Sequence, residues 1–252
     1  MEVIINTTPV GTYPNNGGRL IDLTDFPHCC GVIDVIYNPL ATDLLQQAEA
    51  LDIPHSNGLP MLVAQATAAA EYFLDETGLQ KENQRIITAL TMDTENIVLI
   101  GMPGCGKSTL GRRLSKMTGK PFVDMDSYIE DQEGCSIPEI FEKHGEKYFR
   151  DLETAAARAL GKERGQIIAT GGGAVLRPEN MKALGQNGRI VFISRALEDL
   201  ATKGRPLSKN YDALKKMYEQ RLPLYNKYSR YTVSVDGTIN ETADELRSVL
   251  GY

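Results

Sequence analysis

The sequence predicts an α/β fold built on a five-stranded parallel sheet with helices on both faces. After residue 96, short apolar runs alternate with helical patterns, and such alternation is typical of parallel strands joined by helices. A glycine-rich segment, residues 101–108, lies between the first apolar run and the first helical pattern. Because ligands bind at the carboxyl ends of parallel strands, we expect a ligand site there.

The elements follow in chain order from these patterns. The first strand, 97–100, is wholly apolar, as expected of a strand buried on both faces. We predict the strands of the sheet at residues 97–100, 121–123, 166–170, 189–194 and 231–235. We predict helices at residues 109–114, 137–143, 147–160, 179–184 and 211–221. Residues 1–80 form a second, smaller α/β segment, joined to the first by a linker over residues 81–95.

Composition excludes several classes of protein. The 252 residues are 42% hydrophobic and 24% charged, which is ordinary for a folded globular chain. A net charge of −6 argues against nucleic acid or an anionic membrane surface as the main partner. The four cysteines lack Cys-x-x-Cys spacing, and no apolar run approaches the length of a bilayer span. We therefore expect a cytoplasmic protein with neither a disulfide framework nor a zinc site.

Residues 101–108 match the phosphate-binding pattern G-x-x-x-x-G-K-[ST] at every fixed position. Glycines let the backbone wrap round a polyphosphate, and the positive end of the following helix faces the anion. Lys107 would reach the β- and γ-phosphates, and the Ser108 hydroxyl would ligate Mg²⁺. A plain turn between strand and helix does not explain a lysine and a serine in this order. The expected ATP contacts are Gly101, Gly104, Cys105, Gly106, Lys107, Ser108 and Thr109.

Two carboxylates, Asp124 and Asp126, end the second predicted strand. Residues at i and i+2 of a strand point to the same side, here toward the expected ligand. One can hold Mg²⁺ through water while the other accepts a proton from an attacking hydroxyl. For Asp124, the metal role and the capping of the next helix are equally open. Asp126 is our candidate catalytic residue.

The third strand ends in Gly171-Gly172-Gly173, which permits close approach of a ligand to the backbone. Three arginines accompany it: Arg150, which has Glu153 at i+3, Arg205 and Arg221. Any one arginine is more often a solvated surface residue, and Arg150 alone could simply pair with Glu153. Taken alone, each of the three arginines keeps that interpretation.

Taken together, these motifs make residues 97–250 resemble shikimate kinase, a P-loop kinase. The phosphate loop is shared by many kinases, but the combination Phe-Arg-x-x-Glu, Gly-Gly-Gly and a late arginine is far more specific. The matching motifs start at Gly101, Asp124, Gly134, Phe149, Gly171, Arg205 and Arg221. This resemblance implies a kinase domain over residues 96–252.

The resemblance implies that ATP, with Mg²⁺ at Ser108 and Asp124, phosphorylates the 3-hydroxyl of shikimate. Arg150 and Arg221 would clamp the shikimate carboxylate, and Asp126 would hold a ring hydroxyl and accept its proton. The other implied acceptor contacts are Gly171, Gly172, Gly173, Phe141, Phe149 and Glu153. For the two phenylalanines, a core role is equally open.

Lys107 and Arg205 would stabilise charge on the transferred phosphoryl group. Arg205 belongs to the lid that closes over the substrate in this family. The lid segment, 203–209, is shorter here than in many family members. The arginine that often stacks on adenine is not evident in residues 236–240, so the adenine contacts stay open.

The first 80 residues resemble only the carboxyl-terminal part of shikimate dehydrogenase, in the runs 6–11, 32–42 and 58–66. Tyr37 and Gln65 match positions that line the substrate cleft of that enzyme. The dinucleotide fingerprint and the lysine–aspartate pair of the dehydrogenase are absent from this chain. We therefore expect a partial Rossmann-like segment without dehydrogenase activity.

A partial domain buries less of its apolar surface than a whole one. We expect residues 1–80 to dock on the kinase domain, on a second copy of the chain or on a dehydrogenase. Two other functions remain open for the whole chain: another small-molecule kinase of the P-loop class, and a nucleotide-binding scaffold for a dehydrogenase partner. Intact Lys107, Asp126 and Arg205 argue against the scaffold.

Overall fold

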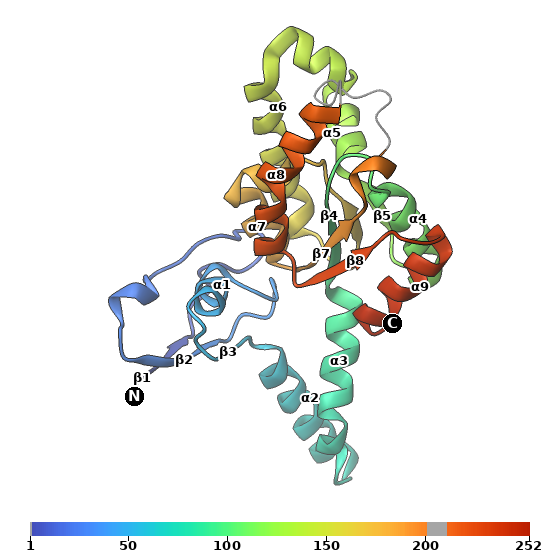
Figure 1. The fold of residues 1–252 in the computed structure, drawn as a ribbon. Coiled ribbons are helices and arrows are strands. Elements are labelled where there is room, and N and C mark those ends of the chain that lie inside the picture. Colours follow the sequence, from blue (N-terminus) through green and yellow to red (C-terminus); the bar gives the residue numbers. More distant parts are fainter. Residues whose placement is uncertain (1, 201–210) are drawn as a thin grey trace. The chain divides into compact units, whose positions relative to one another are not determined.

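The computed structural model describes residues 2–200 and 211–252. The chain divides into two compact units, Met1–Glu95 and Asn96–Tyr252, and each is considered by itself (Figure 1). Within the described residues, no helix combines the length and the apolar character needed to cross a membrane.

A five-stranded sheet forms the centre of the second unit. All of its neighbouring strands are parallel, in the order β5-β6-β4-β7-β8. The strands are β4 (Asn96–Ile100), β5 (Phe122–Asp124), β6 (Ile167–Ala169), β7 (Gly188–Ser194) and β8 (Tyr231–Ser234). Every residue of β4 is buried, because it is the central strand with helices on both faces. The predicted fold class is confirmed.

The helices cover both faces of this sheet. They are α4 (Lys107–Thr118), α5 (Met125–Glu133), α6 (Ile137–Lys162), α7 (Pro178–Gly185), α8 (Tyr211–Tyr228) and α9 (Ile239–Leu250). The helices α4 and α9 pack together on one face, and α7 and α8 contact β7 on the other. Right-handed crossovers between parallel strands produce this division.

The helix α6 joins two helices that the sequence predicts separately, 137–143 and 147–160. They meet at Gly145, whose backbone (φ 79°, ψ 176°) is not helical. A conformation with positive φ is open to glycine at little cost. A capping box of Ser136 and Glu139 starts the helix. The second half of α6, after this bend, carries Arg150 and Glu153, and α6 packs against α7.

The first unit holds a three-stranded parallel sheet in the order β1-β2-β3. Its elements are β1 (Glu2–Asn6), β2 (Cys29–Asp34), α1 (Asp43–Ala50), β3 (His55–Ser56), α2 (Leu59–Leu74) and α3 (Asn83–Thr94). Val32 of β2 packs with Leu44 and Leu45 of α1. In contrast, Val3 and Ile5 each keep 57% of their surface exposed. One face of this small sheet is therefore covered and the other is open.

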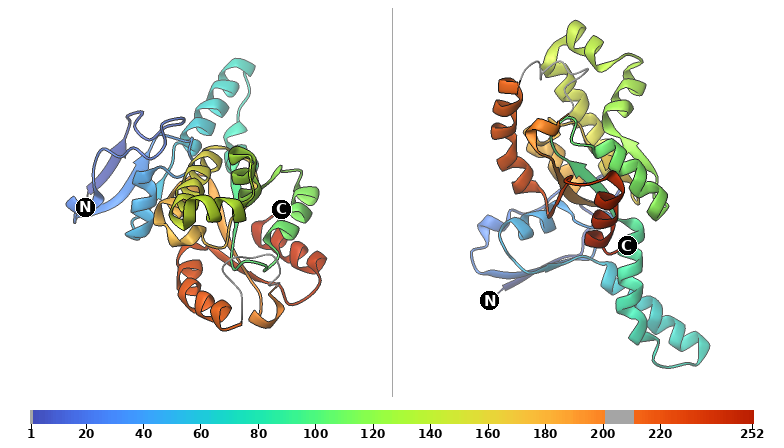
Figure 2. Two further views of the ribbon diagram at one scale, coloured as in Figure 1. Left: turned by 90° about the horizontal axis from the view of Figure 1, so that it is seen from above. Right: turned by 45° about the vertical axis from the view of Figure 1, so that its right-hand side comes forward.

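The expected linker, residues 81–95, is largely helical. It comprises the end of the 3₁₀ turn η2 (Leu79–Glu82) and the helix α3, which lies alongside α2 (Figure 2). The apolar residues of this segment give α3 a face that packs on α2. The segment thus belongs to the first unit, which ends at Glu95.

Candidate active site

The phosphate loop leaves β4 and enters α4 at the carboxyl edge of the sheet. Gly101 has a φ of 146°, and a Cβ there would lie 2.4 Å from the carbonyl oxygen of Ile193. Lys107 is buried, and its Nζ donates to the carbonyl oxygens of Gly101 (2.9 Å) and Met102 (3.0 Å). The ammonium group is thereby held across the mouth of the loop, where an anion would meet it.

The paired aspartates at the end of β5 have different surroundings. The Asp124 carboxylate accepts from the Ser108 hydroxyl (2.5 Å) and from the Asp126 backbone N–H (3.1 Å), so it caps α5 and also contacts the phosphate loop. The Oδ1 atom of Asp126 is buried and has no hydrogen-bond partner among the described residues. Burial, and next the charge of Asp124, raise the pKa of Asp126 from 3.8 to about 6.

Each glycine of the Gly171-Gly172-Gly173 run lies against a different group of the site. A Cβ on Gly171 would lie 2.7 Å from Asp126 Oδ1 and 2.8 Å from Glu153 Oε1. A Cβ on Gly173 would lie 2.2 Å from Nη1 of Arg150. A side chain at Gly171 or Gly173 would collide with these groups where they now lie, so the glycines let the carboxylates and the guanidinium group approach the backbone.

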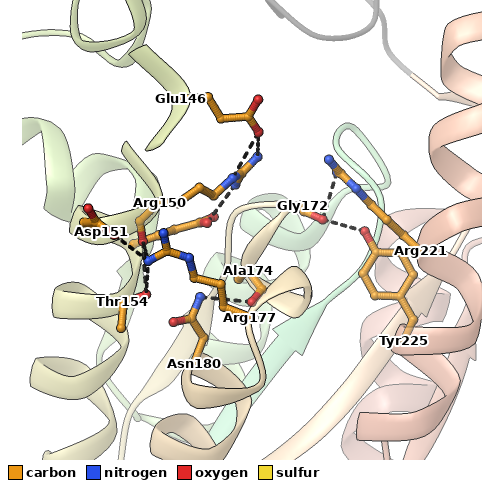
Figure 3. Close-up of polar contacts among 11 residues, drawn as sticks. Glu146, Arg150, Asp151, Thr154, Gly172, Ala174, Arg177, Asn180, Arg221 and Tyr225 are labelled. Carbon is orange, nitrogen blue, oxygen red and sulfur yellow. Dashed lines mark hydrogen bonds and ion pairs between the residues drawn. The ribbon is translucent and has the colours of Figure 1, made fainter. Parts of the chain in front are cut away.

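Arg150 and Arg221 are both buried and both reach the glycine run (Figure 3). Arg150 Nη1 donates to Glu153 Oε2 at 2.7 Å, while its Nη2 lies 3.0 Å from Glu146. Burial works to lower the pKa of Arg150, but Glu153 and Glu146 outweigh it and raise that pKa. Arg221 Nη1 donates to the carbonyl oxygen of Gly172 at 3.0 Å. Both guanidinium groups are therefore held in place by hydrogen bonds.

A cavity of about 580 Å³ connects the phosphate loop, the aspartates and the arginines. Phe141 and Phe149 form part of its wall, with ring centroids 4.9 Å apart, and both also contact the core. The lining includes Gly104, Gly106, Lys107, Ser108, Thr109, Asp124, Asp126, Phe141, Phe149, Arg150, Glu153, Gly171, Gly172, Gly173 and Arg221. Gly101 and Cys105 are buried within the loop itself and are not among the lining residues. Arg205 lies outside the described residues.

Several residues of the site were not predicted. Glu130, Pro138, Thr170 and Met217 also line the cavity. Tyr225 donates from its hydroxyl to the same Gly172 carbonyl as Arg221, at 2.7 Å. Tyr225 lies four residues after Arg221, one helical turn further along the chain, and this spacing could have indicated that the two share a face of the helix. The four other lining residues carry no such signal in the sequence.

Comparison with known proteins decides the family. The family model for shikimate kinase matches residues 103–250, more than half of the chain.

The chain belongs to the shikimate kinase family.

Relatives and solved structures of this family match about the same share of the chain. The chain is 42% identical over 159 residues to a shikimate kinase of Clostridium botulinum and spans 96% of that protein. It is 44% identical over 159 residues to a shikimate kinase of Clostridium beijerinckii, spanning 94% of it. It also resembles the structure of shikimate kinase from Acinetobacter baumannii in complex with shikimate, with 32% identity and a TM-score of 0.60. That match covers 65% of this chain and 97% of the other. The enzyme class predicted from the motifs is confirmed.

Proposed function

We propose that residues 96–252 transfer the γ-phosphoryl group of ATP to the 3-hydroxyl of shikimate. The observation that carries this proposal is the cavity itself, which has a phosphate loop at one end and two buried arginines, Arg150 and Arg221, at the other. A small molecule that bears a carboxylate and a hydroxyl can bridge the two ends. The resemblance to family members, one of them in complex with shikimate, supports this choice of acceptor.

The two arginines would bind the acceptor through its carboxylate. Arg150 and Arg221 approach the glycine run from different helices, α6 and α8, so their guanidinium groups can meet one carboxylate from two sides. Charge-assisted hydrogen bonds of this kind are about twice as strong as neutral ones. A neutral acceptor would form no charge-assisted hydrogen bond with either arginine.

Asp126 would accept the proton of the attacking hydroxyl. Its unpartnered Oδ1 faces the glycine run beside the cavity, and a pKa of about 6 leaves it ionised near neutral pH while still able to take a proton. The hydroxyl oxygen forms a bond to the γ-phosphorus, its proton passes to Asp126, and the bond to the β-phosphate oxygen of the leaving ADP breaks. Lys107 and Arg205 would stabilise the charge on the transferred group.

The residues beside the phosphate loop suit Mg²⁺. Ser108 and Asp124 provide hard oxygen donors that already lie within hydrogen-bond distance of each other. We infer that they hold the ion together with phosphate oxygens of ATP. When bound, Mg²⁺ neutralises charge on the β- and γ-phosphates.

We infer that the first unit has no dehydrogenase activity by itself, because the dinucleotide fingerprint and the lysine–aspartate pair are missing from it. Incubation of the chain with shikimate and an oxidised nicotinamide cofactor should give no reduced cofactor. Formation of reduced cofactor in proportion to the amount of chain would overturn this inference.

Product analysis tests the kinase proposal. The purified chain is incubated with shikimate and Mg·ATP, and the products are followed by phosphorus NMR. We expect ADP and one new phosphate monoester, on the 3-hydroxyl, in equal amounts, and no ADP when shikimate is omitted. A phosphate on another hydroxyl, or binding of ATP without turnover, would contradict the proposal.

A further inference from the structure

Arg177 occupies a fixed position directly after the glycine run. It follows the 3₁₀ turn η3 (Ala174–Leu176) and precedes Pro178, which favours the extended backbone observed there (φ −112°, ψ 114°). Asn180 donates from its backbone N–H to the Arg177 carbonyl oxygen (3.0 Å) and from its side chain to Ala174 (3.0 Å). Two hydrogen bonds and a proline therefore fix the base of the Arg177 side chain.

From this base, the guanidinium group of Arg177 reaches one turn of α6 (Figure 3). Its Nη1 lies 2.9 Å from the carbonyl oxygen of Arg150, 3.1 Å from the hydroxyl of Thr154 and 2.8 Å from the carboxylate of Asp151. The Thr154 hydroxyl in turn donates to the Arg150 carbonyl at 3.0 Å. All three acceptors lie on the turn that carries Arg150.

The short segment from Gly173 to Arg177 thus touches Arg150 at two places. Gly173 lies against the guanidinium group, and Arg177 binds the backbone carbonyl of the same residue. The distance between the Arg150 guanidinium and the glycine run therefore depends on how the backbone of α6 is held at this turn. No other described side chain outside α6 donates a hydrogen bond to the Arg150 carbonyl.

We propose that Arg177 is a positioning residue for the carboxylate of the acceptor. It acts through Arg150: it holds the α6 turn against the segment that follows the glycine run, and so sets the gap between Arg150 and Arg221. This inference rests on the proposed function, because it assumes that the two arginines bind the acceptor carboxylate. It assigns to Arg177 a role in the affinity for the acceptor and none in the handling of ATP.

Arg177→Gln tests the proposal, with Arg158→Gln as the matched control. Arg158 is an exposed residue of α6 and has no polar partner among the described residues. The control therefore removes one positive charge from α6 without changing the turn that Arg177 contacts. Initial rates are measured with shikimate varied at saturating Mg·ATP, and then with Mg·ATP varied. Binding of shikimate without nucleotide is measured by calorimetry, and folding by thermal unfolding.

We expect Arg177→Gln to raise the KM and the Kd for shikimate about tenfold or more, the scale on which small displacements of binding groups act. The KM for ATP and the kcat at saturating shikimate should stay close to those of the parent chain. Arg158→Gln should match the parent chain in every value. Arg177→Lys, which keeps the charge but not the planar fork, should have a smaller effect than Arg177→Gln.

An unchanged KM and Kd for shikimate in a folded Arg177→Gln variant would overturn the inference, as would an equal rise in the KM for both substrates. If Arg177→Gln does not fold, the same criteria apply to Arg177→Lys. Failure of the proposed function gives a different result, since the parent chain itself would then show no shikimate-dependent release of ADP.

Discussion

Gly173→Ala should separate binding of the acceptor from binding of ATP. The backbone of Gly173 (φ −99°, ψ −3°) suits alanine, so the substitution introduces no backbone strain. The new methyl group would lie 2.2 Å from Arg150 Nη1 and 2.7 Å from its Cζ. Contact at 3.4 Å is ordinary, so the guanidinium group must withdraw by about 1.2 Å. Because the obstructed atoms are the end of a flexible side chain, the fold should survive.

A displacement of about 1 Å in a binding group can cost up to about a hundredfold in rate. We therefore expect kcat/KM for shikimate to fall by about ten- to a hundredfold in Gly173→Ala, through KM, with the KM for ATP unchanged. The assay couples ADP release to an indicator reaction, with each substrate varied in turn. Gly31→Ala is the control, since a Cβ there meets its nearest atoms at 3.6 to 3.9 Å in the first unit. An unchanged KM for shikimate in Gly173→Ala would refute the placement of Arg150.

The further predictions concern three single groups of the site. In the proposed mechanism ionised Asp126 accepts the proton, and burial raises its pKa to about 6, so kcat/KM for shikimate should fall as the pH drops through 6. Asp126→Asn should abolish turnover but keep ATP binding. The raised pKa means that the stabilising contribution of protonated Asp126 is complete below pH 3.8 and lost as the pH rises through about 6. Asp126→Asn should therefore raise the free energy of unfolding by about 2 kcal/mol at pH 8 but not at pH 3.5. This value is smaller than the full pKa shift implies, because the residue is only half-buried. An equal change at both pH values in denaturant titrations would contradict this prediction. Tyr225→Phe removes one of the two donors to the Gly172 carbonyl. It should lower the free energy of unfolding by about 1 kcal/mol in the same titrations and raise the KM for shikimate. A variant as stable as the parent would show that the hydroxyl contributes nothing. Lys107→Met removes the buried ammonium group at the phosphate loop, so calorimetry should detect much weaker ATP binding while shikimate still binds; unaltered ATP affinity would exclude the assigned role.

The five strands of the sheet could be predicted from the sequence because they are short, mostly apolar runs between helical patterns. Their observed bounds differ from the predicted ones by one residue at most ends. The phosphate loop and the paired aspartates were also predictable, since their chemistry depends on local spacing. Asp124 shows the limit of that reasoning, because its capping bond and its contact with Ser108 occur together.

The supporting contacts could not be predicted, because they join residues that are distant in sequence. Arg177 reaches the Arg150 carbonyl 27 positions away, and Tyr225 reaches the Gly172 carbonyl 53 positions away. A lone arginine before a proline carries no such signal. The helix α3 was also not predicted, because many of its residues are polar, as in a linker. Its apolar residues are explained only by its contact with α2, which the sequence does not show.

The central claim is that Arg150 and Arg221 select a carboxylate while the phosphate loop delivers the phosphoryl group. It is tested most directly by comparing shikimate with its carboxyl-reduced analogue, an alcohol of nearly the same shape, in the ADP-release assay. We predict that kcat/KM for the alcohol is lower by about a hundredfold or more, because the alcohol would lose the charge-assisted hydrogen bonds of the carboxylate to the two buried arginines. Equal kcat/KM values for the two compounds would contradict the claim.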